Sequence, residues 1–327
     1  MKTIITLFFF TSITLPLCGQ TLAYTAPSGY VKSNLVVGFN PIGINLHGDI
    51  LVSGIIDSEN ANVITDANVD FAAALNDVNA TYLLEITSGN QNGSVSVITS
   101  STATTVTIEG SGISAGTESY TIRQAHTLNS VFGTGANAML TGGTTSTSAD
   151  IVWLPDGSGG YDQYFYSTFG GANEFRPTTA AFLSVAKPVS IFYPDGLFVQ
   201  VASVAKEITV FGEVKTTPTI AAAAPGFSLI SLQNPVGQTL AESGLETFIS
   251  TGNNPSEADI VFVPTGPSTY NEYFYSTFLG ANAWRLKSSP FVGDEGAVAL
   301  PSSFFIQNIG PTAKVGVITL PAFFTTL

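Results

Sequence analysis

Cysteine, histidine and basic residues are scarce in this chain of 327 residues, which holds one cysteine, two histidines and ten Lys and Arg. With 23 Asp and Glu, the net charge is −13. Nucleic acids and anionic membrane surfaces are bound by clustered cations, whereas the cations here are spread singly along the chain. We therefore expect neither as a partner. The lone Cys18 excludes a disulfide framework and a thiolate metal site.

The scarcity of histidine also bears on catalysis. A serine triad or a zinc site needs a well-placed histidine with an acidic partner, and no motif supplies one to His47 or His126. Asp150 and Asp259 would form a carboxylate pair of the kind that cleaves glycosides, but they occupy equivalent positions of a repeated segment. We predict instead that each holds a turn by hydrogen bonds to the backbone. The sequence thus predicts a protein that is not an enzyme, with no catalytic residues and no cofactor beyond the calcium considered below.

The N-terminus predicts a secretory signal peptide. Lys2 supplies its positive charge, the run Ile4–Leu17 its apolar segment, and cleavage is expected after Gly19 or after Ala23. The apolar run is too short for a transmembrane anchor, so no membrane span is expected in the mature chain. Lipidation of Cys18 is an alternative. The residue before it, Leu17, is larger than the lipoprotein signal peptidase usually takes, which argues against lipidation. We expect an exported protein, extracellular or at the cell surface, with the periplasm as the alternative.

Small residues are abundant where charged ones are few. The chain holds 32 glycines, 44% hydrophobic residues and only 10% charged residues. Long amphipathic helices need Lys, Glu and Arg on their solvated faces, whereas short strands joined by tight turns suit this mixture. The composition therefore predicts an all-β protein of sandwich-like or barrel-like domains.

One segment of the chain occurs twice. Residues 149–176 (ADIVWLPDGSGGYDQYFYSTFGGANEFR) align without a gap with residues 258–285 (ADIVFVPTGPSTYNEYFYSTFLGANAWR), and 17 of the 28 positions are identical at a constant offset of 109. We name these segments the aromatic blocks. Weaker similarity pairs residues 35–46 with residues 229–240 through a shared Asn-Pro-x-Gly sequence. The chain is therefore predicted to be internally duplicated, with each half beginning near its Asn-Pro motif.

An additional segment near 76–127 makes the first half the longer one. It contains four short stretches rich in β-branched residues and separated by Gly or Asn, which predict a small inserted β module. The apolar run 315–327 predicts a strand that pairs within the body or with the edge of a neighbouring chain. The predicted organisation is a signal peptide at 1–23, a first β repeat at 24–216 with the module at about 76–127, a linker at 217–225 and a second β repeat at 226–327.

The opening TAPSGYVKSN, the segment YLLEITSG and the paired aromatic blocks together resemble a family of secreted proteins of verrucomicrobial bacteria. The resemblance covers most of the mature chain. The family is functionally uncharacterised and often present as many paralogues. The resemblance therefore implies bacterial export and carries over no active-site residues.

The aromatic blocks are the strongest lead to a binding function. In a strand, alternate side chains face opposite sides, so each block presents aromatic rings in a row. Such rings either pack in the core between layers or form platforms that stack on sugars or anchor a protein partner. The candidate ligand-binding residues are Tyr164, Tyr166, Phe175, Tyr273, Tyr275 and Trp284.

A structural calcium site is the one metal site that the sequence suggests. Asp66, Asn68 and Asp70 have the alternating oxygen spacing of a calcium loop, with Asp77 at its twelfth position. Phe71 stands where such a loop needs glycine for its sharp turn. The three residues from Asp66 to Asp70 are the candidate ligands.

Two functions remain open on these observations. The first is a non-enzymatic structural, adhesive or assembly role, with self-association or other surface proteins as partners. It follows from predicted export, duplication, low charge and the lack of a catalytic set. The alternative is a carbohydrate-binding module that uses the aromatic blocks on a polysaccharide.

Overall fold

The computed structural model describes residues 27–110, 117–185, 187–321 and 323–324. The predicted signal peptide and Cys18 lie outside them. The described chain is all-β, which confirms the predicted fold class, and its two α-helices are short: α1 (Phe71–Ala74) and α2 (Leu128–Phe132). In that part of the chain no helix is long and apolar enough to cross a membrane.

Each half is built from seven corresponding strands. Those of the first half are β1 (Ser28–Leu35), β2 (Gly38–Ile42), β10 (Ile151–Pro155), β11 (Tyr161–Ser167), β12 (Glu174–Pro177), β13 (Leu197–Val201) and β14 (Lys206–Glu213). Those of the second half are β15 (Thr219–Ala223), β16 (Gly226–Ser231), β18 (Ile260–Gly266), β19 (Thr269–Ser276), β20 (Ala283–Leu286), β22 (Ser303–Asn308) and β23 (Lys314–Ile318). A short additional pair, β17 (Gln238–Thr239) and β21 (Ala299–Leu300), belongs to the second half.

The two halves have the same strand order. The first forms an antiparallel sheet β12-β11-β10-β13-β2 and the second a sheet β20-β19-β18-β22-β16. Beside each sheet lies a two-stranded ribbon, β1 with β14 and β15 with β23. Each half buries its own hydrophobic core, the first around Val152 and Val199 and the second around Val261 and Ile306.

The predicted linker at 217–225 is wrong, because it contains β15. The run Thr219–Ala223 pairs with β23 as β1 pairs with β14. It lacks turn-forming residues, and alternate residues (Thr219, Ala221 and Ala223) are buried, as expected of a half-buried strand. The second half therefore starts with β15. The apolar C-terminal run correspondingly contributes β23 within the body, up to Ile318.

The two Asn-Pro motifs are not equivalent in the structure. Asn40 and Pro41 lie inside β2, whereas the second motif follows the end of β16. Phe39 pairs with Gln200 and Phe227 pairs with Gln307, so Phe39 and Phe227 are the corresponding residues. A four-residue match was too short to fix the register between two divergent strands.

Between β2 and α2 the chain forms the inserted module, a seven-stranded sheet of order β3-β9-β6-β7-β8-β5-β4. Four of its strands lie in the segment predicted at about 76–127, and the other three lie upstream of it, so the module starts near residue 50. The upstream strands were missed because they are short and interrupted by polar residues. The strands are β3 (Ile50–Ile55), β4 (Ser58–Asn60), β5 (Val63–Thr65), β6 (Tyr82–Ile86), β7 (Val95–Ser101), β8 (Thr105–Ile108) and β9 (Ser119–Gln124).

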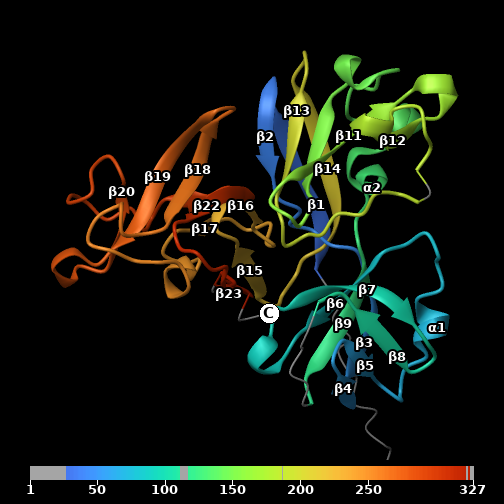
Figure 1. Cartoon of the computed structure of the whole chain (residues 1–327), viewed down its shortest axis with the longest axis horizontal. Helices are drawn as coiled ribbons and strands as arrows, with labels where there is room; N and C mark the ends of the chain where they lie inside the picture. The colour runs from blue at the N-terminus through green and yellow to red at the C-terminus, as the bar shows by residue number, and fades with distance from the viewer. Residues whose placement is uncertain (1–26, 111–116, 186, 322, 325–327) are drawn as a thin grey trace, which may run out of the picture.

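Strand β6 is buried on both faces. Tyr82, Leu84 and Ile86 point into the module's own core beside Phe71 of α1. Leu83 points the other way, into the core of the first half. The apolar run of β6 is thus explained by its place between two cores. In Figure 1 the long axis is horizontal, and the first and second halves lie toward its right and left ends. The module lies below the first half.

The halves meet about an approximate twofold axis, because corresponding residues contact each other across the boundary. The rings of Phe198 and Phe305 lie 5.5 Å apart between centroids. Gly196 donates its N–H to Leu229 O at 3.1 Å, and Ser231 donates its N–H to Pro194 O at 3.3 Å. The main chains of residues 194–196 and 229–231 therefore approach closely at this boundary.

Substituting Gly43 by alanine should weaken this boundary. An added Cβ would overlap the carbonyl oxygen of Ser302 and lie 2.6 Å from Ser231 Oγ. We expect the free energy of unfolding to fall by about 2 kcal/mol or more, as for overpacked cores. Gly29→Ala is the matched control, because nothing lies within 4 Å of the added Cβ. Urea unfolding measures both, and equal midpoints for the two variants would contradict the close approach.

Candidate functional site

The predicted aromatic platforms are wrong for four of the six candidates. Tyr166, Phe175, Tyr273 and Trp284 are between 2% and 4% exposed, so their ring faces are closed to a ligand. Tyr166 stands opposite Phe175 across the β11–β12 pair, and Trp284 likewise stands opposite Tyr275. These cross-strand pairs fill the cores of the two halves, as the alternative interpretation predicted.

The other two candidates are half-buried. Tyr275 packs on Trp284, with ring centroids 5.5 Å apart, and donates its hydroxyl to Asn282 O at 3.2 Å. Tyr164 reaches a surface hollow beside β11. The structure therefore does not bring the six residues together into one site.

The predicted calcium ligands are engaged in other bonds. Asp66 is buried and accepts hydrogen bonds from Tyr120 Oη at 2.8 Å and from the N–H of Asn68 at 2.9 Å. Asp70 caps α1 by accepting the N–H of Ala73 at 3.1 Å. Among the described residues no group of three or more His, Cys, Asp or Glu is arranged to hold a metal. The structure thus lends the calcium prediction no support, because the residue after Asp70 starts a helical turn instead of a sharp loop.

Asp150 and Asp259 make the backbone bonds predicted for them. Asp150 accepts the N–H groups of Thr141 and Ala202, at 2.7 and 2.8 Å. Asp259 accepts the corresponding groups of Ser250 and Ile309, at 2.7 and 3.0 Å. Each buried carboxylate thus ties the strand that opens an aromatic block to two neighbouring segments.

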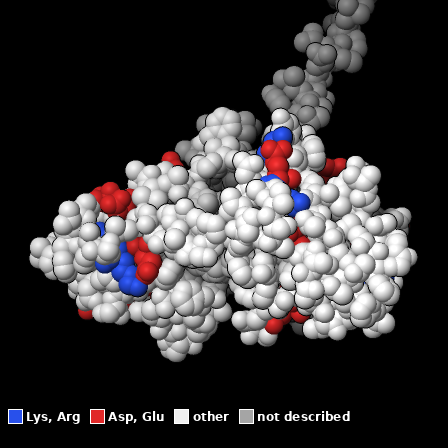
Figure 2. Space-filling model, turned by 90° about the horizontal axis from the view of Figure 1, so that it is seen from above, with Lys and Arg blue, Asp and Glu red and all other residues white. Residues whose placement is uncertain are grey.

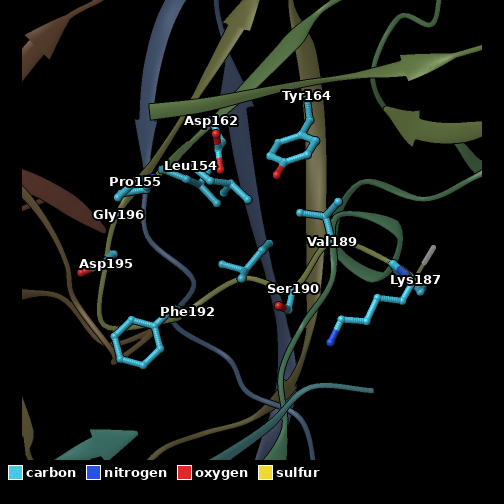
Figure 3. A pocket seen from close by; sticks show the side chains of 13 residues that line it. Leu154, Pro155, Asp162, Tyr164, Lys187, Val189, Ser190, Phe192, Asp195 and Gly196 are labelled. Carbon is cyan, nitrogen blue, oxygen red and sulfur yellow. The ribbon is translucent and has the colours of Figure 1, made fainter. Parts of the chain in front are cut away.

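The accessible hollow beside β11 has a volume of about 350 Å³. In Figure 3, Asp162 and Tyr164 lie on the β11 side, and Val189, Ser190 and Lys187 lie across from them. The whole lining is Leu154, Pro155, Asp162, Tyr164, Lys187, Pro188, Val189, Ser190, Ile191, Phe192, Asp195, Gly196 and Leu197. We name this site the β11 hollow.

The β11 hollow is lined by several groups that form hydrogen bonds. Burial raises the pKa of Asp195 to about 6. Burial and the nearby charge of Asp162 raise the pKa of Tyr164. Ser190 has no histidine beside it in the lining, so no imidazole activates its hydroxyl. The lining has two carboxyls, two hydroxyls and one Lys, groups that form hydrogen bonds with a polyhydroxylated ligand.

A second group of polar residues is buried where the module, the first half and the connection to the second half meet. Lys215 Nζ lies 2.7 Å from Glu85 Oε1 and donates to Thr217 O at 2.8 Å, while Tyr193 donates its hydroxyl to Glu85 at 3.2 Å. Nearby, an Arg123–Glu213 ion pair spans 2.7 Å. We name these residues, with His47, the junction cluster: His47, Glu85, Arg123, Tyr193, Glu213 and Lys215.

The junction cluster is closed to solutes and therefore structural. Lys215 is fully buried and Glu85 is 1% exposed. Burial lowers the pKa of Lys215 to about 8, against the opposing effect of the Glu85 carboxylate. The sequence offered one signal for this cluster, a glutamate within the apolar run of β6, but nothing in the sequence indicated its partner.

His47 is held neutral in this cluster. Burial lowers its pKa well below the ordinary value, and the positive charges of Lys215 and Arg123 act in the same direction. Its ring packs 4.4 Å from that of Tyr193, and its Nε2 lies 3.3 Å from Gln233 O of the second half. The neutral ring therefore joins both halves.

No protein-family model, curated protein or solved structure matches the chain. Function is therefore inferred below from the chain's own geometry and chemistry.

Acid should destabilise the fold through His47. Below pH 6.5 the unfolded state binds a proton at this histidine and the folded state does not, so stability is lost as the pH falls. Between pH 6.5 and 5.0 the free energy of unfolding should fall by about 1.5 kcal/mol, because each unit of pKa difference corresponds to about 1.4 kcal/mol. His47→Gln keeps a donor for Gln233 O and should lack this loss.

Urea unfolding of both proteins across this pH range measures the difference. Asp195 titrates in the opposite sense, since its raised pKa favours the folded state in acid, but it contributes equally to both proteins. Identical pH slopes for the two proteins would show that His47 is protonated in the folded state.

Proposed function

We propose that this is a non-enzymatic exported protein that works by assembly or adhesion outside the cell or at the bacterial cell surface. The observation that carries the proposal is a pair of exposed apolar patches at corresponding places of the two halves. Predicted export and the resemblance to secreted verrucomicrobial proteins support the same conclusion.

We name the two patches the tips. The first tip consists of Phe169, Phe182 and Leu183, and the second of Phe278, Leu279, Phe291 and Val292. In each tip two phenylalanine rings contact each other, with centroids 4.9 Å apart. Phe182 is 61% exposed and Val292 is 71% exposed. Exposed apolar groups gathered in one place are typical of interaction sites.

The tips are held in place by an arginine that ends each aromatic block. Arg176 donates to Ala181 O at 3.2 Å, next to Phe182. Arg285 donates to Gly293 O at 2.8 Å, next to Val292. A patch that is already ordered loses little conformational entropy when it binds a partner.

The two tips have similar residues, whereas the exposed turn within each aromatic block differs between the halves. Both phenylalanines of the first tip have a phenylalanine at the offset of 109, whereas the turns at 156–160 (DGSGG) and 265–269 (TGPST) share one residue of five at corresponding positions, a glycine. Both turns are mostly exposed, so exposure alone does not keep residues the same. Apolar side chains that no fold requires, yet that occur in both halves, indicate a shared role in binding.

The proposal predicts concentration-dependent association of residues 24–327. The apolar groups of the tips have no cover within the described chain, and burying them between molecules is favourable. Sedimentation velocity between about 1 and 200 μM should show a rising weight-average mass, and negative-stain images should show regular oligomers. A compact monomer over the whole range, with no binding to a bacterial surface fraction, would overturn the proposal.

A carbohydrate-binding role is the second candidate, and the β11 hollow favours it. Tyr164 and the carboxyl of Asp162 face a hollow large enough for one or two sugar rings. A glycan screen should then give ligands whose affinity falls at least tenfold in Tyr164→Ala and in Asp162→Asn. Tyr275→Ala, outside the hollow, is the control. Equal affinity in all variants would remove this candidate.

A further inference from the structure

We propose that copies of this chain join end to end through their tips and so form open chains along the long axis of the molecule. This inference rests on the proposed assembly function and names the surface and the partner, a second copy of the same chain.

The tips lie at opposite ends of the molecule. The first tip adjoins β12 and the second adjoins β20, and Figure 1 shows these strands toward opposite ends of the long axis. The approximate twofold axis between Phe198 and Phe305 explains this placement, because it directs corresponding loops away from each other. A molecule with binding surfaces at its two ends continues to add copies, since each contact leaves another end free.

Leu279 is the clearest sign that the second tip serves a contact. Its φ is 53°, in the left-handed region, and 89% of the residue is exposed. The first half has Gly170 at this position, with a φ of 64°. Leucine is strained there and packs on nothing that the fold needs, and such strain is retained where it has a function. The turn therefore presents an apolar side chain to solvent.

The charge of the protein favours a second copy over a membrane as the occupant. Apolar loops that enter an anionic bilayer are usually flanked by unpaired cations, whereas the net charge here is −13. Lys287, beside the second tip, is paired with Glu272. Figure 2 shows few charged groups on the face of the molecule that is seen from above.

The size of the tips fits a repeated, weak contact. Two phenylalanines and one or two aliphatic side chains bury roughly 400 Å² per partner when covered, about half of a standard interface. A single such contact is weak, but each copy makes two. This is the arrangement expected of chains that form only at high local concentration, as on a cell surface.

The test uses residues 24–327 with one tip altered at a time. The first-tip variant is Phe182→Ser with Leu183→Ser, and the second-tip variant is Leu279→Gly with Val292→Ser. Altering one tip should stop growth at dimers or below, and altering both should leave monomers at concentrations where the wild type forms chains. The control is Val78→Ser with Val204→Ser, which removes comparable exposed apolar surface away from the tips and should assemble like the wild type.

Leu279→Gly alone has a second readout. Relief of the left-handed strain should raise the melting temperature by about 2 °C, while the association constant falls at least threefold. A residue with only a structural role would not move the two quantities in opposite directions.

The outcomes separate the two proposals. A wild type that never associates overturns the assembly function itself. A wild type whose chains are unaffected by either tip variant overturns this inference and leaves assembly standing. Tip-dependent sedimentation with vesicles containing 30% phosphatidylglycerol, without self-association, would overturn the second copy as the occupant in favour of a lipid surface.

Discussion

The buried ion pair between Lys215 and Glu85 fixes how the three parts of the molecule sit together. Glu85 belongs to β6 of the module, and Lys215 belongs to the connection between β14 and β15, so the pair ties the insertion to the passage from one half to the other. Taking two charges out of water costs several kcal/mol per ion, and removing one partner of such a pair typically costs 3–5 kcal/mol. The module therefore cannot move away from this connection without leaving an uncompensated charge. The hydrogen bonds from Tyr193 and to Thr217 extend that constraint into both neighbouring segments.

With the module held in place, the relation between the halves depends on backbone contact. Glycine at 43 and at 196 lets the chains approach where any larger residue would meet Ser302 or Leu229. Phe198 and Phe305 then stack across the axis. The twofold relation is thus set by small residues at the boundary, and it determines that the two aromatic blocks point their ends in opposite directions. The placement of an exposed apolar patch toward each end follows from the fold rather than from any feature of the tips themselves.

Sequence reasoning reached the features that depend on local pattern. The all-β class followed from composition, and the backbone role of Asp150 and Asp259 followed from their equivalence. It failed where neighbours in space decide. Whether Trp284 forms a binding platform or part of the core depends on which segments cover the face of β20. The alternation of residues along the strand does not reveal those segments. The calcium spacing at Asp66 was present, yet Tyr120, 54 residues away, occupies its carboxylate. The exposure of the tips was hidden for the same reason, because Phe169 and the buried Phe165 look alike in sequence.

Because the two halves are parts of one chain, their sequences can differ, and so can the two ends of the molecule. Two identical subunits about a twofold axis would present the same tip at each end. In this chain the first tip carries the flat Gly170–Gly171 turn, where the second projects Leu279. The exposed Leu279 has no corresponding side chain at the first tip, so the two ends of the molecule are not identical. Contacts between unlike ends give a chain with a direction, in which every copy has the same orientation. The strained leucine therefore has its most economical explanation in the partner that it meets and not in the half that carries it.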